Sequence, residues 1–202
     1  MNTFLPQPER RQNGLDEGQI KQWIPAICAG NEHYFQKLYE ETCTEVYRTT
    51  RFLMIHQQDA EDVVSEVYLA LWKSLHQYDP ARPFRFWLHG LIMRKVQDWR
   101  RTSWRRLRIL ERKKALGTAY PHNDILQKEA EQDLFQLLTI LSAKHREVII
   151  LRFYHDYTLE EIAALLHISL GTVKSRLHHA LKKLRKKVEN KSLQEAGENH
   201  GF

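Results

Sequence analysis

Residues 158–184, TLEEIAALLHISLGTVKSRLHHALKKL, are the stretch that decides the fold. Thr158 and Glu161 form the pattern of a capping box at the start of one helix. His167 follows in a tight turn, at a position that often holds glycine because φ is positive there and that histidine tolerates better than most residues. Ser169 then predicts the cap of a second helix. Two helices joined in this way form a helix-turn-helix, the arrangement that places one helix in the DNA major groove.

The second helix of this motif has an apolar side and a basic side. Val173, Leu177 and Leu181 recur at helical spacing, so they are predicted to pack beneath it. On the outer side, Arg176 has the fork geometry to bind guanine or to bridge a phosphate, and Lys174 is better suited to a phosphate. The sequence therefore predicts DNA as the leading partner.

Charge is distributed along the chain in three blocks. Residues 31–80 hold nine acidic and four basic side chains, whereas residues 82–114 hold twelve basic and two acidic ones. Residues 172–188 contain seven Lys/Arg and no acidic residue. The whole chain has a formal net charge of +6 and a pI of about 9.3. An acidic block followed by two basic blocks favours a protein-binding face and two nucleic-acid contacts.

The first basic block mixes arginines with aromatic residues. Residues 84–106 read FRFWLHGLIMRKVQDWRRTSWRR. Basic side chains bind phosphates, and aromatic rings stack on unpaired bases with about 1–3 kcal/mol for each base. This combination favours single-stranded or opening DNA over a closed duplex. Trp87 is predicted to lie in the core, whereas Trp99 and Trp104 are candidates for the surface because arginines flank them.

Scarce glycine, helical spacing of apolar residues and the absence of strand-like alternation predict an all-α fold. It consists of two small helical domains joined by a flexible linker, with the boundaries 15–114, 115–127 and 128–189. Asp16 and Asp59 are predicted to cap the first and third helices, and Gly30 to end the first one. The helices expected in the first domain cover residues 17–29, 32–52, 59–76 and 84–112.

Several classes of protein are excluded by the sequence. No run of 18 apolar residues exists and the first residues lack an apolar signal core, so neither membrane insertion nor export is expected and the location is cytoplasmic. Cys28 and Cys43 fit no metal motif and are predicted to be buried or half-buried thiols in a reducing compartment. No phosphate-binding glycine motif or catalytic triad occurs, and the eleven histidines are scattered. We therefore expect no enzyme activity, no metal and no cofactor.

Four segments together resemble an extracytoplasmic-function (ECF) sigma factor of the sigma-70 family. Residues 31–39, NEHYFQKLY, and 59–72, DAEDVVSEVYLALW, resemble the family's region 2. Residues 84–106 resemble the part of that region that contacts the −10 promoter element. Residues 141–152, LSAKHREVIILR, followed by the helix-turn-helix, resemble region 4, which reads the −35 element. The resemblance extends over about residues 15–188.

This resemblance implies roles for three sets of residues. The residues expected to contact the −35 element are Ser169, Thr172, Lys174, Ser175, Arg176, His179 and Lys183. The residues expected at the −10 element are Arg85, Arg94, Lys95, Asp98, Trp99, Arg101 and Arg105. The residues expected to dock on core RNA polymerase are Asp59, Glu61, Asp62, Glu66 and Trp72. The implied partners are the β′ coiled coil and the β flap of the polymerase, promoter DNA and an anti-sigma factor.

The sequence also departs from the family pattern and leaves alternatives open. Arg94 stands where many relatives carry asparagine, and His179 where arginine is common, so no promoter consensus is transferred. One alternative is a helix-turn-helix regulator that acts without polymerase, although such a regulator has no need of the motif at residues 59–72. The other is a helical-bundle enzyme with metal ligands among Asp59, Glu61, Asp62 and Glu66, but no Glu-x-x-His motif is paired with them.

Overall fold

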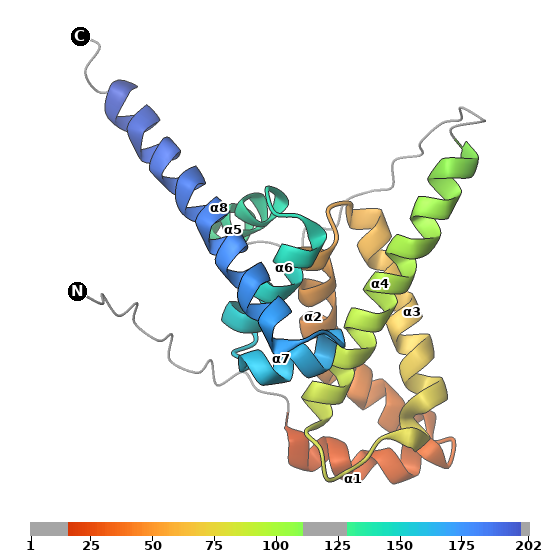
Figure 1. The fold of residues 1–202 in the computed structure, drawn as a ribbon. Helices are drawn as coiled ribbons and strands as arrows, with labels where there is room; N and C mark the ends of the chain where they lie inside the picture. Colours follow the sequence, from red (N-terminus) through yellow and green to blue (C-terminus); the bar gives the residue numbers. More distant parts are fainter. Residues whose placement is uncertain (1–15, 111–128, 199–202) are drawn as a thin grey trace.

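The computed structural model describes residues 16–110 and 129–198, and their side chains in 16–102 and 134–189. All described elements are helical, as the sequence predicts, and the predicted linker at 115–127 lies outside them (Figure 1). η1 is a 3₁₀ turn and η2 a π-helical turn. The elements are α1 (Glu17–Cys28), α2 (Glu32–Leu53), α3 (Gln57–Ser74), η1 (Leu75–Gln77), α4 (Phe84–Leu110), α5 (Glu129–Thr139), α6 (Ala143–Ile149), η2 (Ile150–Tyr154), α7 (Leu159–Leu166) and α8 (Leu170–Glu198).

The first helix begins and ends as predicted. The Asp16 carboxylate accepts a hydrogen bond from the backbone N–H of Gln19 at 3.0 Å, which caps α1. Gly30 has a φ of +89°, a conformation that favours glycine, and it turns the chain into α2. Cys43 is half-buried as expected, but the prediction for Cys28 is wrong: this residue is exposed, because the last turn of α1 directs the neighbouring Ile27 into the core instead.

The predicted cap of the third helix is wrong. α3 begins at Gln57 with His56 in the capping position, and no side chain provides a capping hydrogen bond there. Asp59 lies within the first turn, where its negative charge favours the positive end of the helix dipole. The error is a shift of one helical turn and leaves the predicted helix itself in place.

α4 is held in the first unit, which we define as α1 to α4, by a carboxylate from α1. The Glu17 side chain accepts hydrogen bonds from the backbone N–H groups of Phe84 at 2.7 Å and Arg85 at 2.9 Å. These are two of the donors that the first turn of a helix leaves without an internal partner. Thr42 and Tyr68 bind each other at 2.8 Å in the interior and connect α2 to α3.

The second unit, α5 to α8, contains the predicted helix-turn-helix. The Thr158 hydroxyl accepts from the N–H of Glu161 at 3.2 Å, and the Glu161 carboxylate accepts from the N–H of Thr158 at 2.8 Å, so the capping box is confirmed. His167 has the left-handed conformation, with φ 52° and ψ 47°. The Ser169 hydroxyl accepts from the N–H of Thr172 at 3.2 Å and caps α8.

One of the predicted inward residues of α8 points outward. Val173 is fully buried and Leu177 packs against the core, but Leu181 is 39% exposed. Ala180 takes the inward position and is fully buried, because the contact with the rest of the unit continues along positions 173, 177, 180 and 184.

We expect the capping box to contribute measurably to the second unit. Thr158→Ala removes one of its two reciprocal hydrogen bonds, and this should lower the free energy of unfolding by about 1 kcal/mol. Urea denaturation followed by circular dichroism measures the change. Thr44→Ala, at an exposed position inside α2, is the matched control and should have little effect. Equal stability losses in the two variants would contradict the role of the cap.

The two units pack against each other over α2, α4, α6, α7 and η2 (Figure 1). Phe52 meets Tyr154 edge to face with 5.1 Å between ring centroids, and Phe86 meets Tyr157 at 5.7 Å. Gly90 of α4 lies so near α7 that a Cβ there would be 3.8 Å from a methyl carbon of Leu165. Residues far apart in the sequence therefore share one interface.

Candidate nucleic-acid interface

The candidates for the −35 element all lie on α8 or at its cap. Ser169, Lys174, Ser175, His179 and Lys183 are exposed, and Thr172 and Arg176 are half-buried. The hydroxyls of Ser169 and Thr172 bind each other at 2.8 Å, so both side chains take part in the local structure of the helix start. The helix therefore presents a set of polar and basic side chains.

Four of these candidates form a stripe along α8. Thr172, Arg176, His179 and Lys183 follow one another at intervals of four, three and four residues, which places them on one helix face. His145 of α6 stacks on His179 with 6.3 Å between ring centroids. Burial and the nearby charges of His179, Lys183 and Arg176 lower the pKa of His145. Two of the four stripe residues, Arg176 and Lys183, are permanent cations of the kind that bind phosphates.

Some of the −10 candidates on α4 lie outward and pair with acidic residues. Arg94 and Arg101 are exposed, and Arg101 forms an ion pair with Asp98 one turn away. Lys95 binds the Glu66 carboxylate of α3 at 3.2 Å. The side chain of Arg105, and that of Trp104, lie outside the described residues.

Two −10 candidates point inward instead. Trp99 is half-buried against the core, and its indole nitrogen is buried without a hydrogen-bond partner in the described structure. Arg85 binds the Glu45 carboxylate of α2 at 2.6 Å. Trp87 packs against the core as predicted. Aromatic residues between arginines therefore do not all face solvent, since one side of α4 packs on the bundle.

The acidic candidates follow one side of α3. Glu61, Asp62 and Glu66 are exposed and Asp59 is half-buried. Trp72, expected at the polymerase contact, is 42% exposed and packs edge to face on Phe35. Leu69 is 54% exposed on the same side. Exposed apolar residues next to carboxylates are typical of a protein-binding surface. Leu69 was not predicted for this surface, although its spacing of three residues from both Glu66 and Trp72 indicates that it shares their side of the helix.

A network of buried charges joins the two units at the end of α2. The Leu53 carbonyl accepts from Arg100 at 2.7 Å and from Arg146 at 3.1 Å. Arg100 also forms an ion pair with the buried Glu147. Burial raises the pKa of Glu147, and Arg100 opposes this shift. Two guanidinium groups thus neutralise the negative end of the α2 dipole.

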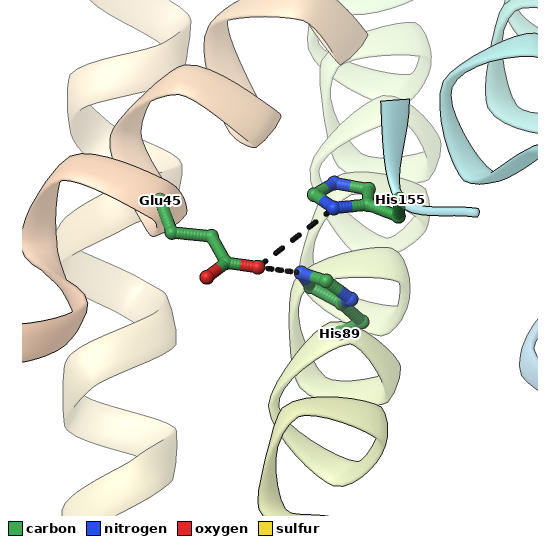
Figure 2. Close-up of side chains that lie close together, drawn as sticks. All are labelled: Glu45, His89 and His155. Atoms are coloured by element: carbon green, nitrogen blue, oxygen red, sulfur yellow. Dashed lines mark ion pairs between the residues drawn. The ribbon is translucent and has the colours of Figure 1, made fainter. Parts of the chain in front are cut away.

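A second polar cluster lies in the same interface. Figure 2 shows the Glu45 carboxylate facing the rings of His89 and His155. Glu45 Oε1 lies 2.9 Å from Nε2 of His89 and 3.7 Å from Nδ1 of His155. Burial disfavours the charged form of Glu45, but His89 and Arg85 outweigh it and its pKa is lowered. Burial lowers the pKa of His89, and burial with the charges of His89 and Arg85 lowers that of His155 further.

These two clusters were not predicted from the sequence. Histidines that are scattered along the chain come together in space, so scatter in the sequence is a weak argument against a metal site. Conversely, Asp59, Glu61, Asp62 and Glu66 form no three-ligand group in the part of the chain that the structure describes.

Among the described helices, none is long and apolar enough to span a membrane.

Comparison with known proteins accounts for both units. The model of sigma-70 region 2 matches residues 38–106, and that of sigma-70 region 4 matches residues 137–186. The chain is 32% identical to the ECF RNA polymerase sigma factor SigL of Mycobacterium tuberculosis over 165 residues, which cover 80% of this chain and 93% of SigL. The chain belongs to the ECF sigma factors of the sigma-70 family.

Other relatives agree with this assignment. This sigma factor is 28% identical to SigX of Bacillus subtilis over 78% of its own length and 85% of SigX. Its fold matches CnrH solved in complex with the cytosolic domain of CnrY, with a TM-score of 0.58 and 26% identity over 88% of this chain and 99% of CnrH. The region 2 match decides against a helix-turn-helix regulator that acts without polymerase. The chain is a transcription initiation factor that binds core RNA polymerase and promoter DNA.

Proposed function

We propose that this sigma factor reads the −35 element with α8 and the −10 element with α4, and that it has no catalytic activity of its own. The observation that carries the proposal is the stripe of Thr172, Arg176, His179 and Lys183, on a helix whose start is fixed by a capping box and a left-handed turn. A helix held in this way can enter the major groove with its first turns. Arg176 is the residue that we assign to fork onto a base edge.

At the −10 element, the outward residues of α4 are the ones we assign to DNA. Arg94 and Arg101 would bind phosphates as the strands separate, and Asp98 would orient Arg101 through their ion pair. Lys95 would join them on leaving the Glu66 carboxylate. Arg85 and Trp99 contact DNA only if they leave their present partners, since Glu45 and the core hold them. The boundaries that we assign to the two units are 15–114 and 128–189, joined by 115–127.

The polymerase contact is assigned to the side of α3 that contains Asp62, Glu66, Leu69 and Trp72. Its carboxylates suit a basic partner surface, which we assign to the β′ coiled coil, and Leu69 and Trp72 add apolar area. The second unit is assigned to the β flap. An anti-sigma factor is proposed as the regulator, supported by the similarity to CnrH in its complex with CnrY. All of these partners belong to the cytoplasm of a bacterial cell.

Run-off transcription with bacterial core polymerase tests the proposed function. The purified chain, added to core enzyme and a library of genomic promoter fragments, should produce discrete start sites that core enzyme alone does not use. Mapping these start sites also provides the −35 and −10 sequences. Tight binding to DNA without any start site directed by core enzyme would overturn the proposal.

We expect the α3 surface to control core binding. Asp62→Ala combined with Glu66→Ala removes two charges from one helix face and should weaken the affinity for core polymerase about 5- to 50-fold, most strongly at low salt. Fluorescence anisotropy of the labelled chain measures this affinity. Glu40→Ala with Glu41→Ala on α2 removes the same charge from other exposed positions and should change it little. Unchanged affinity of the Asp62/Glu66 variant would remove the docking assignment.

A further inference from the structure

The interface between the two units brings together three side chains that are common metal ligands. Glu45 comes from α2, His89 from α4, and His155 directly follows η2 (Figure 2). One ligand atom of each residue lies within 4.8 Å of the other two. We propose that Glu45, His89 and His155 bind a divalent transition metal of the Zn²⁺ type between the two units. This site goes beyond promoter recognition, and its three ligands are not among the residues assigned to DNA or to the polymerase.

Two of the three spacings between the ligand atoms are close to those of such an ion, and the third, between the two imidazole nitrogens, is at most 4.8 Å, so binding would draw the two rings together. A tetrahedral zinc site with bonds of about 2.0–2.2 Å separates its ligand atoms by about 3.3–3.6 Å. Glu45 Oε1 lies 2.9 Å from one imidazole nitrogen and 3.7 Å from the other. Although it is close to the carboxylate, Nε2 of the fully buried His89 does not meet the geometry of a hydrogen bond. A buried nitrogen without a directed partner is what a metal ion would satisfy.

Both histidines are oriented by partners on their far side. Nδ1 of His89 binds the Tyr157 hydroxyl at 2.7 Å, and Nε2 of His155 binds the Thr49 hydroxyl at 3.0 Å. In metal sites the second ring nitrogen of a histidine is held in this way, which fixes the tautomer and turns the other nitrogen to the ion.

Arg85 is the competing cation at this site. Its Nε lies 2.6 Å from Glu45 Oε1, and its terminal nitrogen lies 3.3 Å from Nδ1 of His155. A metal ion must displace it, and the surroundings allow this because the Arg85 side chain is 36% exposed. It lines a cavity of about 600 Å³ together with Asp156 and Glu161, two other carboxylates that it could pair with. Of the three proposed ligands, His155 also lines this cavity.

Competition between Arg85 and the metal makes the sharpest prediction. The untagged full chain, freed of metal with a chelator that is then removed, should bind one Zn²⁺ and give a cobalt absorption spectrum typical of a tetrahedral site. Zinc at 100 times Kd should raise Tm by roughly 5–10 °C. Arg85→Gln should bind Zn²⁺ at least roughly tenfold more tightly, because a positive charge next to the ion is removed. Tyr157→Phe should weaken binding about 10- to 100-fold.

Ligand variants and a histidine control decide whether the site is the one proposed. His89→Gln and His155→Gln should each lose the bound zinc and the rise in Tm, whereas His145→Gln, beside His179 in the second unit, should keep both. Retained binding in the first two variants, or equal loss in His145→Gln, would overturn the proposal. If the ligand variants do not fold, Arg85→Gln still decides, because unchanged or weaker zinc binding there contradicts the competition. If the wild-type chain does not bind Zn²⁺, the three residues form a hydrogen-bonded network only, and the proposal of a metal site is overturned.

Discussion

Replacing Arg146 with methionine is expected to lower the free energy of unfolding by about 3 kcal/mol. This side chain is 2% exposed, and its guanidinium donates to three backbone carbonyls: Leu138 at 3.0 Å, Leu141 at 3.1 Å and Leu53 at 3.1 Å. Burial and the charge of Arg100 lower the pKa of Arg146 to about 10, so it remains charged at neutral pH. Methionine has a similar length but no donor, and it leaves buried carbonyls with fewer partners.

Two further variants separate this effect from a simple loss of charge. Arg146→Lys keeps the charge but cannot reach three carbonyls at once, so it should recover only a minor part of the lost stability. Arg152→Met removes a half-buried arginine with one hydrogen bond, to the Tyr157 carbonyl at 2.8 Å, and should cost about 1 kcal/mol. Urea denaturation measures all three. An Arg146→Met variant no less stable than Arg152→Met would show that the three-carbonyl contact does not hold α6 in place.

The local signals in the sequence predict much of this fold. The caps at Asp16 and Thr158, the left-handed turn at His167 and the stop at Gly30 depend on neighbours within a few residues, so a single sequence contains the information. The resemblance of residues 59–72, 84–106 and 141–152 to known motifs, together with the helix-turn-helix, indicates the family. Asp59 shows the limit of such signals, because an acidic residue is favourable both at the cap and in the first turn.

Contacts between distant segments could not be predicted in this way. In the sequence, charged residues such as Arg100, Arg146 and Glu147 look like ordinary solvent-exposed side chains. Only the packing of α4 and α6 around the end of α2 makes them a buried network. Glu45, His89 and His155 lie in different elements, so no spacing rule connects them. Arg85 was assigned to DNA because it lies in a basic block, and its partner Glu45 could not be read from that block. Charge patterns identify the kinds of partner, while the packing decides which charges remain available.

Arg176→Ala is expected to weaken the binding of the polymerase holoenzyme to its promoter about 5- to 150-fold, corresponding to the 1–3 kcal/mol of a specific base contact. Arg176 lies in the middle of the α8 stripe, about two turns beyond the capped start of the helix. The residues before it on the same face, Ser169 and Thr172, bind each other, which leaves Arg176 as the first long donor of the stripe. The loss of Arg176 should therefore reduce the effect of −35 mutations on promoter affinity. The effect of −10 mutations on that affinity should stay the same.

The matched variants distinguish base recognition from phosphate binding. Arg176→Lys keeps the positive charge but loses the fork, so it should retain salt-dependent binding while discriminating less between promoters with an intact and a scrambled −35 element. Lys37→Ala, on α2, removes one positive charge from the first unit. It should change neither the affinity for the promoter nor the discrimination between the two promoters. Filter binding of the holoenzyme at two salt concentrations measures affinity and discrimination together. If Arg176→Ala weakened both promoters equally, Arg176 would be a phosphate contact, and the base-reading role would pass to another residue of the stripe.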